Sequence, residues 1–332
     1  MVYGTDLKVG EVVGQDPGRP ACQLAVPVLT VQAFPPDPAE LPALAAALGQ
    51  LTDEDPLLQL CWVREKGELH LNITGVIQLE VLTELLAERY GLEVRFSRPS
   101  VLYRETPASA ATGRAVYLSP KPCWAIVELA VEPLPPGSGI RFQSAIKGGT
   151  LPYQYQNHVA QSLPGALEQG LMGWPVTDAA FTLTDGQSHH VHTHPLDFFV
   201  ATPMAVMDAL EKAGTTLLEP MLRVTLSAGE DLLGRVVGDM LAMRGSFDTP
   251  VIRDGSFTME AILPVSTSLD YPVQFRSMTR GEGSWFSAFD GYQPCPPELG
   301  ATLPRRTPDP RDREKWILYR RGAIRDGGGG IT

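Results

Sequence analysis

The 332-residue sequence has few cysteines and no long apolar runs. No stretch approaches the roughly 18 uninterrupted apolar residues of a transmembrane helix, and residues 1–10 lack the apolar core of a secretory signal. The four cysteines, Cys22, Cys61, Cys123 and Cys295, are far apart and form no Cys-x-x-Cys pair. These absences disfavour a membrane span, export and a disulfide framework, and we expect reduced thiols in a cytoplasmic protein.

Common catalytic motifs are also absent. The sequence contains no phosphate-binding loop of the form GxxxxGK[ST], and no GxSxG, HExxH or EF-hand pattern. Without the glycine-rich loop there is no cradle of backbone N–H groups for a nucleotide phosphate. The sequence therefore predicts no catalytic site, no metal site and no cofactor within these residues.

Positive charge is scarce overall but concentrated near one end. Lys+Arg number 27 against 38 Asp+Glu, which gives a net charge of −11. Residues 304–326 nevertheless hold eight cationic and four anionic side chains, so this segment carries +4 and the remainder −15. A uniformly basic nucleic-acid-binding surface is excluded, whereas a local basic patch is not.

The basic segment allows two interpretations. Asp309 before Pro310 is a typical helix start and Gly322 a typical end, so a helix is expected between them. A run of charges is often only the solvated face of such a helix. Arginine dominates over lysine here, however, and the planar guanidinium grips phosphate with two donors, so contact with phosphate is the alternative.

The spacing of apolar residues predicts the same order of elements twice. Leu69, Leu71 and Ile73 alternate with polar residues as in a half-buried strand. The first copy is expected to contain strand 28–34, helix 38–51, strands 57–64 and 68–74, helix 76–90 and strand 92–96. The second is expected to contain strand 221–226, helix 230–243, strands 247–253 and 257–263, helix 268–278 and strand 284–292. Each copy is a βαββαβ, ferredoxin-like domain.

The region between the two copies follows a different pattern. It is expected to contain strands 124–132 and 139–146, helix 152–171, strand 176–184 and helix 195–212. The predicted fold class is therefore α+β and multidomain, with two ferredoxin-like domains flanking a third α+β domain. The expected divisions are a remnant of a preceding β domain at 1–24, domains at 25–98, 99–219 and 220–294, and a basic helix at 303–326.

Two loops of the middle region are conspicuous, and both are expected at the same end of its domain. One is the glycine-rich run 147–152, and the other is the histidine-rich run 185–194. His190, His192 and His194 would share one face of an extended strand, and imidazole is a common zinc ligand. No cysteine lies nearby, so a polar loop that contacts a partner is favoured over a zinc site or an idle turn.

Several motifs resemble elongation factor G in their order along the chain. They are GELHLNITGVIQLEVLTELLAERYGLEVRFSRPSVLYRET (67–106), KGGTLPYQY (147–155), GWPVTD (173–178), DGQSHHV (185–191) and LLEP (217–220). Within this superfamily, VEPLPPGSG (131–139) and TRGEGSWFSAFDGYQP (279–294) are similar to the tetracycline-resistance ribosomal protection proteins. The basic run LPRRTPDPRDREKWILYRR (303–321) is typical of the protection proteins and not of ordinary elongation factor G.

The resemblance implies domains like III, IV and V of elongation factor G, the middle one related to domain 2 of ribosomal protein S5. It implies a monomeric, cytoplasmic, ribosome-binding translation factor whose fourth domain reaches small-subunit rRNA near the decoding centre and displaces tetracycline. The full-length family is a GTPase, and GTP and Mg²⁺ would be bound by a G domain that these residues lack. The implied ribosome- or rRNA-binding residues are Gly148, Gly149, Thr150, Leu151, Pro152, Gln187, Ser188, His189, His190, Val191, His192, Arg305, Arg306, Arg311, Arg313 and Lys315.

Two alternatives remain beside this hypothesis. GGTLPYQY and DGQSHH are also compatible with part of a translocation factor like elongation factor G. A protein that binds the ribosome without GTP is the other. The chain departs from the protection proteins at His190-Val191-His192, where they carry a proline-containing tip loop, and proline makes a loop stiffer.

Overall fold

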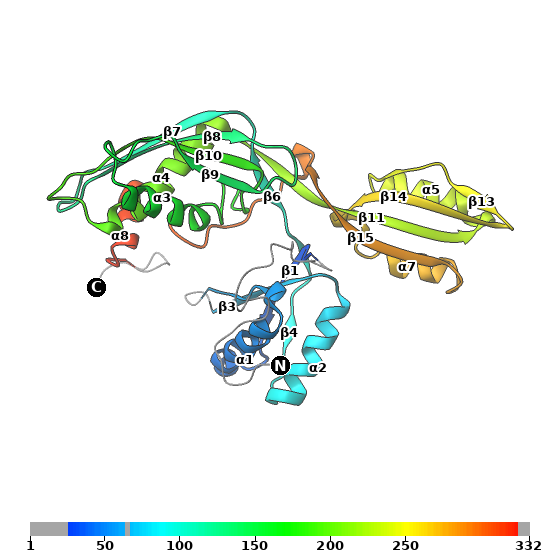
Figure 1. The fold of residues 1–332 in the computed structure, drawn as a ribbon. Helices are drawn as coiled ribbons and strands as arrows, with labels where there is room; N and C mark the ends of the chain where they lie inside the picture. Colours follow the sequence, from blue (N-terminus) through cyan, green and yellow to red (C-terminus); the bar gives the residue numbers. More distant parts are fainter. Residues whose placement is uncertain (1–25, 64–66, 325–332) are drawn as a thin grey trace, which may run out of the picture. The chain divides into compact units, whose positions relative to one another are not determined.

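The computed structural model describes residues 26–63 and 67–324 (Figure 1). The chain divides into two units, Met1–Leu102 with Pro220–Asp290, and Tyr103–Glu219 with Gly291–Thr332. Sheets of five, four and six strands organise the described residues. The predicted α+β, multidomain class is confirmed. The predicted remnant at 1–24 lies outside the described residues.

The first sheet carries both helices of its domain on one face (Figure 1). Its strand order is β2-β3-β1-β4, with β5 also pairing β1. The central pair β1 and β3 is antiparallel, and each strand buries alternate residues, as Leu69 and Leu71 do on β3. The elements are β1 Leu29–Phe34, η1 Pro38–Glu40, α1 Leu41–Glu54, η2 Pro56–Leu58, β2 Cys61–Val63, β3 Glu68–Ile73, α2 Ile77–Tyr90, β4 Arg95–Phe96 and β5 Ser100–Val101.

Local signals predict the start of the first helical segment and the end of α2, whereas α1 runs to Glu54, three residues beyond the predicted end. The Asp37 side chain accepts a hydrogen bond from the Ala39 N–H at 2.9 Å, and Gly91 closes α2 with a φ of 64°. The predicted strand 57–64 is partly wrong, because Pro56–Leu58 forms a 3₁₀ turn whose Leu57 N–H is held by Asp55. The βαββαβ order itself is confirmed.

The second βαββαβ copy is also confirmed. Its sheet order is β12-β14-β11-β15, with β13 pairing β14 and the short strand β6 (Arg104–Pro107) pairing the start of β11. Phe257, Met259 and Leu263 point from β14 into a core that also holds Val236 of α5 and Phe275 of α7. The elements are β11 Thr215–Gly229, η3 Glu230–Leu232, α5 Leu233–Ala242, β12 Ser246–Phe247, β13 Val251–Arg253, β14 Ser256–Pro264, α6 Val265–Ser268, α7 Tyr271–Met278 and β15 Ser284–Pro294.

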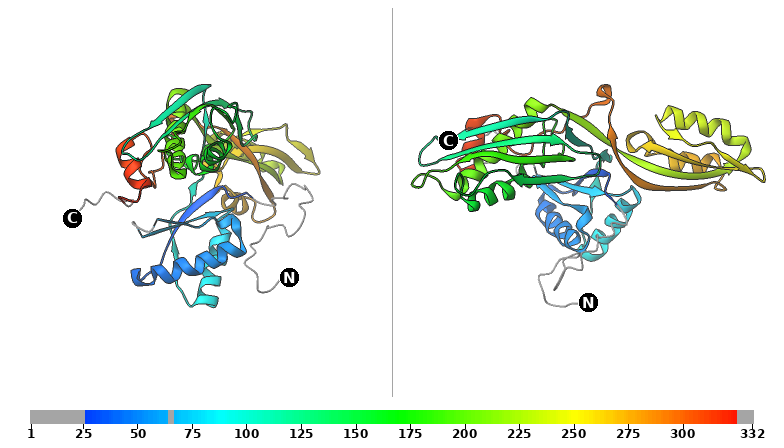
Figure 2. Two further views of the ribbon diagram at one scale, coloured as in Figure 1. Left: turned by 60° about the vertical axis from the view of Figure 1, so that its left-hand side comes forward. Right: turned by 45° about the horizontal axis from the view of Figure 1, so that its top comes forward.

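The middle domain has a four-stranded sheet of order β7-β8-β10-β9. Strand β9 runs parallel to β10, and the other pairs are antiparallel. Helices α3 and α4 cover one face (Figure 2), and α4 supplies the buried side chains Phe198, Val206 and Leu210. The elements are β6 Arg104–Pro107, β7 Ala111–Tyr117, β8 Ala125–Pro133, β9 Ile140–Ser144, α3 Tyr153–Ala166, β10 Ala179–Gln187 and α4 Pro195–Ala213.

The predicted helix 152–171 ends too late. Helix α3 stops at Ala166, and the chain then turns around the buried carboxylate of Glu105. Oε1 of Glu105 accepts hydrogen bonds from the N–H groups of Met172 and Trp174, both at 2.9 Å. The distant carboxylate therefore holds the turn at residues 172–174, which follows the end of the helix.

Strands β6 and β7 were not predicted. On β7, the residues Gly113, Ala115 and Tyr117 face inward, and two of the three are too small to give an apolar signal. Gly113 lies where α4 crosses the strand, and a Cβ atom there would overlap the backbone of Ala205 and Ala209. The close approach therefore requires glycine. Because glycine has no apolar side chain, it also interrupts the alternating pattern by which the strand would be predicted.

The C-terminal segment, residues 295–324, belongs to the same unit as the middle domain. It contains η4 Pro297–Leu299 and α8 Arg313–Arg320. The predicted helix start at Asp309 is wrong, because Asp312 caps α8 while the Asp309 carboxylate holds the Arg311 side chain. The predicted end is confirmed, with Gly322 at a φ of 73°.

Candidate functional site

Two loops leave the middle sheet at the same end, where strands β9 and β10 finish. Because β9 and β10 are parallel and adjacent, the loops that follow them emerge side by side. We call residues 147–152 the glycine loop and residues 188–194 the histidine loop, and the two together the tip. The predicted residue Gln187 is exposed and is the last residue of β10. The sequence-based expectation that these loops share one end of the domain is therefore confirmed by the strand register.

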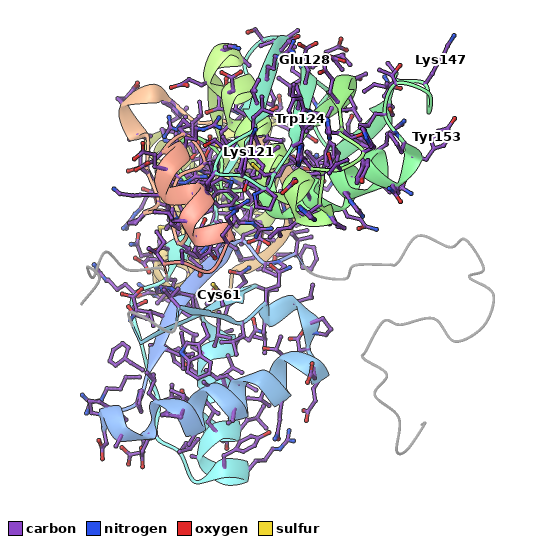
Figure 3. All side chains as sticks on the ribbon, turned by 90° about the vertical axis from the view of Figure 1, so that its left-hand side faces the viewer. Cys61, Lys121, Trp124, Glu128, Lys147 and Tyr153 are labelled. Atoms are coloured by element: carbon purple, nitrogen blue, oxygen red, sulfur yellow. The ribbon has the colours of Figure 1, made fainter. Side chains whose placement is uncertain are left out.

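The glycine loop is anchored beneath the end of β10. Leu151 is fully buried, and a Cβ atom on Gly186 would lie 2.7 Å from its Cδ2 atom. The Gln156 side chain donates to the Leu151 carbonyl at 2.7 Å. Lys147 and Tyr153, by contrast, project away from the domain (Figure 3), and Tyr153 is 71% exposed. Of the predicted residues here, Gly149, Thr150 and Pro152 are exposed and Leu151 supports them from inside.

The histidine loop is held in one conformation by its own polar groups. The His189 N–H donates to Thr193 Oγ1 at 2.7 Å, and the Thr193 N–H returns a bond to the His189 carbonyl at 3.0 Å. Nδ1 of His189 lies within 3.2 Å of the Val191 N–H and 3.3 Å of the His192 N–H. The His189 ring therefore acts as an internal acceptor, while His190 and Val191 are exposed.

Ring stacking organises the outer face of this loop. The centroid of His189 lies 4.7 Å from that of His190 and 4.6 Å from that of His192, and the ring planes are inclined by only 20° and 22°. On its inner side, His189 lies 5.1 Å from the ring of Trp124. Partial burial, together with the neighbouring His192, His190 and Lys121, lowers the pKa of His189 below its ordinary value.

The lowered pKa of His189 predicts that acid loosens the loop. The ordered loop binds a proton less readily than an unfolded one, whose histidine titrates near 6.5. The ordering is therefore complete above about pH 6.5 and decreases as the pH falls toward the lowered pKa. We expect amide exchange of Val191 and His192, corrected for intrinsic rates, to be faster at pH 5.5 than at pH 7.5.

A non-titrating acceptor provides the control for this pH effect. Asparagine places an amide oxygen near the position of Nδ1, so His189→Asn should keep part of the loop order and lose its pH dependence. Equal protection of the wild-type loop at both pH values would contradict the prediction.

Two residues that the sequence analysis does not single out, Asp197 and Trp124, hold the inner side of the histidine loop. Oδ2 of Asp197 accepts the N–H groups of His194, at 2.9 Å, and of Trp124, at 3.0 Å. Thr193 Oγ1 also donates to the Trp124 carbonyl at 2.7 Å. Asp197 lies three residues after the cap position His194, as an acidic residue does in a capping box, so this sequence signal was available.

The predicted basic residues are spread along the domain and do not gather at the tip. Nη1 of Arg305 donates to the carbonyls of Gln169 and Gly170, and this side chain is only 18% exposed. Nη1 of Arg313 donates to the Val116 carbonyl, and the Arg306 N–H donates to Gln169. Lys315 is 72% exposed and lies 3.3 Å from the Asp312 carboxylate. Arg305 thus joins the C-terminal segment to the domain, and Lys315 is the more accessible cation.

Asp309 neutralises part of this positive charge. Its carboxylate lies 2.6 Å from Nη2 of Arg311. Nη1 of the same arginine lies 3.8 Å from the Glu211 carboxylate. Although burial opposes ionisation, the hydrogen bonds from Arg311 hold the pKa of Asp309 below its ordinary value. Burial in turn lowers the pKa of Arg305. The C-terminal segment is therefore less free to bind phosphate than its count of arginines indicates.

Neither a metal centre nor a membrane span is found among the described residues. Within 26–63 and 67–324, no group of three or more His, Cys, Asp or Glu side chains is placed to hold a metal ion. In the same part of the chain, no helix is long and apolar enough to cross a membrane.

Comparison with known proteins gives consecutive matches along the chain. The model of elongation factor G domain III matches residues 24–98, that of domain IV matches 99–214, and that of the elongation factor G C-terminus matches 216–303. The tetracycline resistance protein TetP of Clostridium perfringens is 34% identical over 329 residues, which are 98% of this chain and 50% of that protein.

A solved structure from Thermus thermophilus is similar with a TM-score of 0.65 and 28% identity. The match covers 93% of this chain and 46% of that one, so the chain spans about half the length of these relatives. The order of the three matched models is also the order of the three sheets along the chain. The chain therefore belongs to the elongation factor G family, of which it contains domains III, IV and the C-terminal domain, and it is similar to TetP over nearly its whole length.

Proposed function

We propose that this chain is the ribosome-binding portion of a translation factor of the tetracycline-resistance, ribosomal protection type. In this proposal, the tip enters the decoding region of the small subunit, and its loops displace the drug. The match to TetP over 98% of the chain supports the protection type. The observation that carries the proposal is that two loops lie side by side at one end of the domain IV sheet, after the parallel strands β9 and β10.

The chemistry of the tip suits unpaired RNA bases. Stacked imidazoles offer flat faces, and unstacked bases in RNA are commonly recognised by stacking on aromatic side chains, histidine included. His190 and Val191 are exposed at the end of the loop, while His189 and Thr193 hold the loop from within. Order that exists before binding lowers the entropic cost of docking, because the loop need not be immobilised on contact.

The accessible cations offer a second, less specific contact. Lys315 on α8 and Lys147 in the glycine loop are exposed, and both are suited to phosphate oxygens. The rest of the chain is acidic, so binding to RNA requires these local cations to act at short range. We propose the chain as a monomer in the cytoplasm that uses the tip and these cations together.

Co-sedimentation with purified ribosomes tests the binding. We expect the chain to bind at low salt and to be released progressively as salt rises, because phosphate contacts displace counterions. Replacing His190 and His192 together by alanine should weaken binding by about tenfold, the effect of losing one stacked base. Thr112→Ala, an exposed position near the far end of β7, is the matched control and should bind like the wild type. Absence of binding even at low salt would overturn the proposal.

A chimera separates drug protection from translocation. The matching segment of TetP is replaced by this chain, and the tetracycline sensitivity of a susceptible host is measured. Protection supports the ribosomal protection type. A chimera that is expressed and binds ribosomes without protecting the host would instead favour the translocation-factor alternative, which the elongation factor G models also support.

A further inference from the structure

Arg321, the residue that caps the C-terminal end of helix α8, lies at the base of the tip. Nε of Arg321 donates to the Tyr117 hydroxyl at 2.7 Å, and Nη2 donates to the Pro122 carbonyl at 3.1 Å. The guanidinium carbon also lies 5.7 Å from the centre of the Tyr117 ring. One side chain therefore joins the end of β7 to the turn that follows it.

This turn leads directly to the support of the histidine loop. Cys123 follows Pro122 and is fully buried, which leaves the chain little freedom before Trp124. The Trp124 N–H is held by Asp197, its carbonyl accepts from Thr193, and its ring lies against His189. A continuous series of contacts thus runs from Arg321 through Pro122 and Trp124 to the loop (Figure 3 labels Lys121 and Trp124).

Helix α8 does not need Arg321 in order to dock. Trp316 and Ile317 are each only 5% exposed, and the Trp316 indole N–H donates to the Val200 carbonyl of α4 at 3.0 Å. Arg321 lies after these anchors, at the cap position of the helix. Its two hydrogen bonds are therefore additional to the contacts that anchor the helix, and they hold Tyr117 and Pro122.

We propose that Arg321 is a positioning residue for the histidine loop, acting through Tyr117 and Pro122 on the segment that carries Trp124. The basic C-terminal segment then has an internal role at the tip in addition to any contact with phosphate. The importance of this role for ribosome binding rests on the proposed function, whereas the coupling itself is a property of the free chain.

Amide hydrogen exchange in the free chain tests the coupling. Arg321→Met keeps most of the length of the side chain and removes both donors, and we expect the amides of His189, Val191 and His192 to exchange about tenfold faster. The Trp316 indole signal should be unchanged, since the helix stays docked. Lys315→Met is the matched control, because it removes a cation from the same helix without touching residues 117–122, and its loop should exchange like the wild type.

Arg321→Lys distinguishes directed hydrogen bonds from charge. A lysine keeps the charge and lacks the planar pair of donors, so it should restore less than half of the lost protection. Full protection in this variant, or an unchanged loop in Arg321→Met, would overturn the proposal. So would loss of the Trp316 signal in Arg321→Met, because Arg321 would then dock the helix and not the loop. No ribosome is present, so the result is independent of whether the proposed function is correct.

Discussion

Glu105→Ala is expected to lower the free energy of unfolding of the middle domain by about 3–5 kcal/mol at neutral pH. The side chain is fully buried and accepts from the Met172 and Trp174 N–H groups and, at 2.8 Å, from the Thr215 hydroxyl. Alanine leaves these three donors without an acceptor, and each buried unsatisfied donor costs about 1–3 kcal/mol. Amide exchange of β8 and β10 measures the loss in the full chain.

Glu105→Gln is the matched control for this prediction. Its amide oxygen can accept both backbone N–H groups, and its NH₂ can donate to the Thr215 hydroxyl, which then acts as acceptor. We expect a change within about 1 kcal/mol of the wild type. A glutamine variant as unstable as the alanine variant would show that shape, and not the supply of acceptors, limits stability at this position.

The pKa of Glu105 adds a pH dependence to this comparison. Burial raises its pKa, and the hydrogen bonds from Thr215, Trp174 and Met172 offset the shift only in part. The folded state therefore binds the proton more tightly than the unfolded state, so the contribution of Glu105 is largest below the ordinary glutamate pKa and falls as the pH rises through the raised value. Glu105→Gln should lack this component, and its stability relative to the wild type should increase with pH.

Gly113→Ala is expected to destabilise the same domain by more than about 3 kcal/mol, because the added Cβ atom has no space. It would overlap the backbone of Ala205 and Ala209 on α4, and backbone atoms cannot rotate away as a flexible side chain can. The helix must move off β7, which disturbs the contacts of its buried residues with the sheet. Chemical denaturation measures the loss of stability, and amide hydrogen exchange of β7 and α4 in the native protein measures the local loosening.

Gly165→Ala is the control within the same domain. Gly165 lies in the last turn of α3, and a Cβ atom there meets nothing within 4 Å. Alanine favours the helix over glycine by about 1 kcal/mol, so this variant should be as stable as the wild type or slightly more stable. If both glycine variants were equally tolerated, the close crossing of α4 over β7 would not be a constraint on the fold.

Local sequence signals predict most of the secondary structure because they act within a few residues. The alternation of Leu69, Leu71 and Ile73 requires only that one face of a strand be buried. The caps at Asp37 and Gly91 satisfy backbone groups a few residues away. The predicted order of elements in both βαββαβ copies is accordingly confirmed, with errors mainly at the ends of elements.

The errors occur where a distant residue decides the local conformation. After the end of α3, Glu105, far back along the chain, accepts the N–H groups of Met172 and Trp174 and so holds the turn there. Strand β7 was missed because α4, far along the chain, requires Gly113 at its crossing. The periodicity of a sequence depends only on neighbouring residues, so it does not reveal a hydrogen-bond acceptor or a helix crossing that lies far away along the chain.

The sequence by itself determined the three-domain α+β order, the resemblance to elongation factor G and the two candidate loops, since each depends on neighbouring residues or on an ordered set of motifs. Only the tertiary structure decided how those loops are held and what the basic segment contacts. Arg305 and Arg321 look alike as cations in the sequence, yet one bonds to Gln169 and Gly170 and the other to Tyr117 and Pro122. The reason is physical: hydrogen-bond partners that lie far apart along the chain are brought together by packing, which no local pattern encodes.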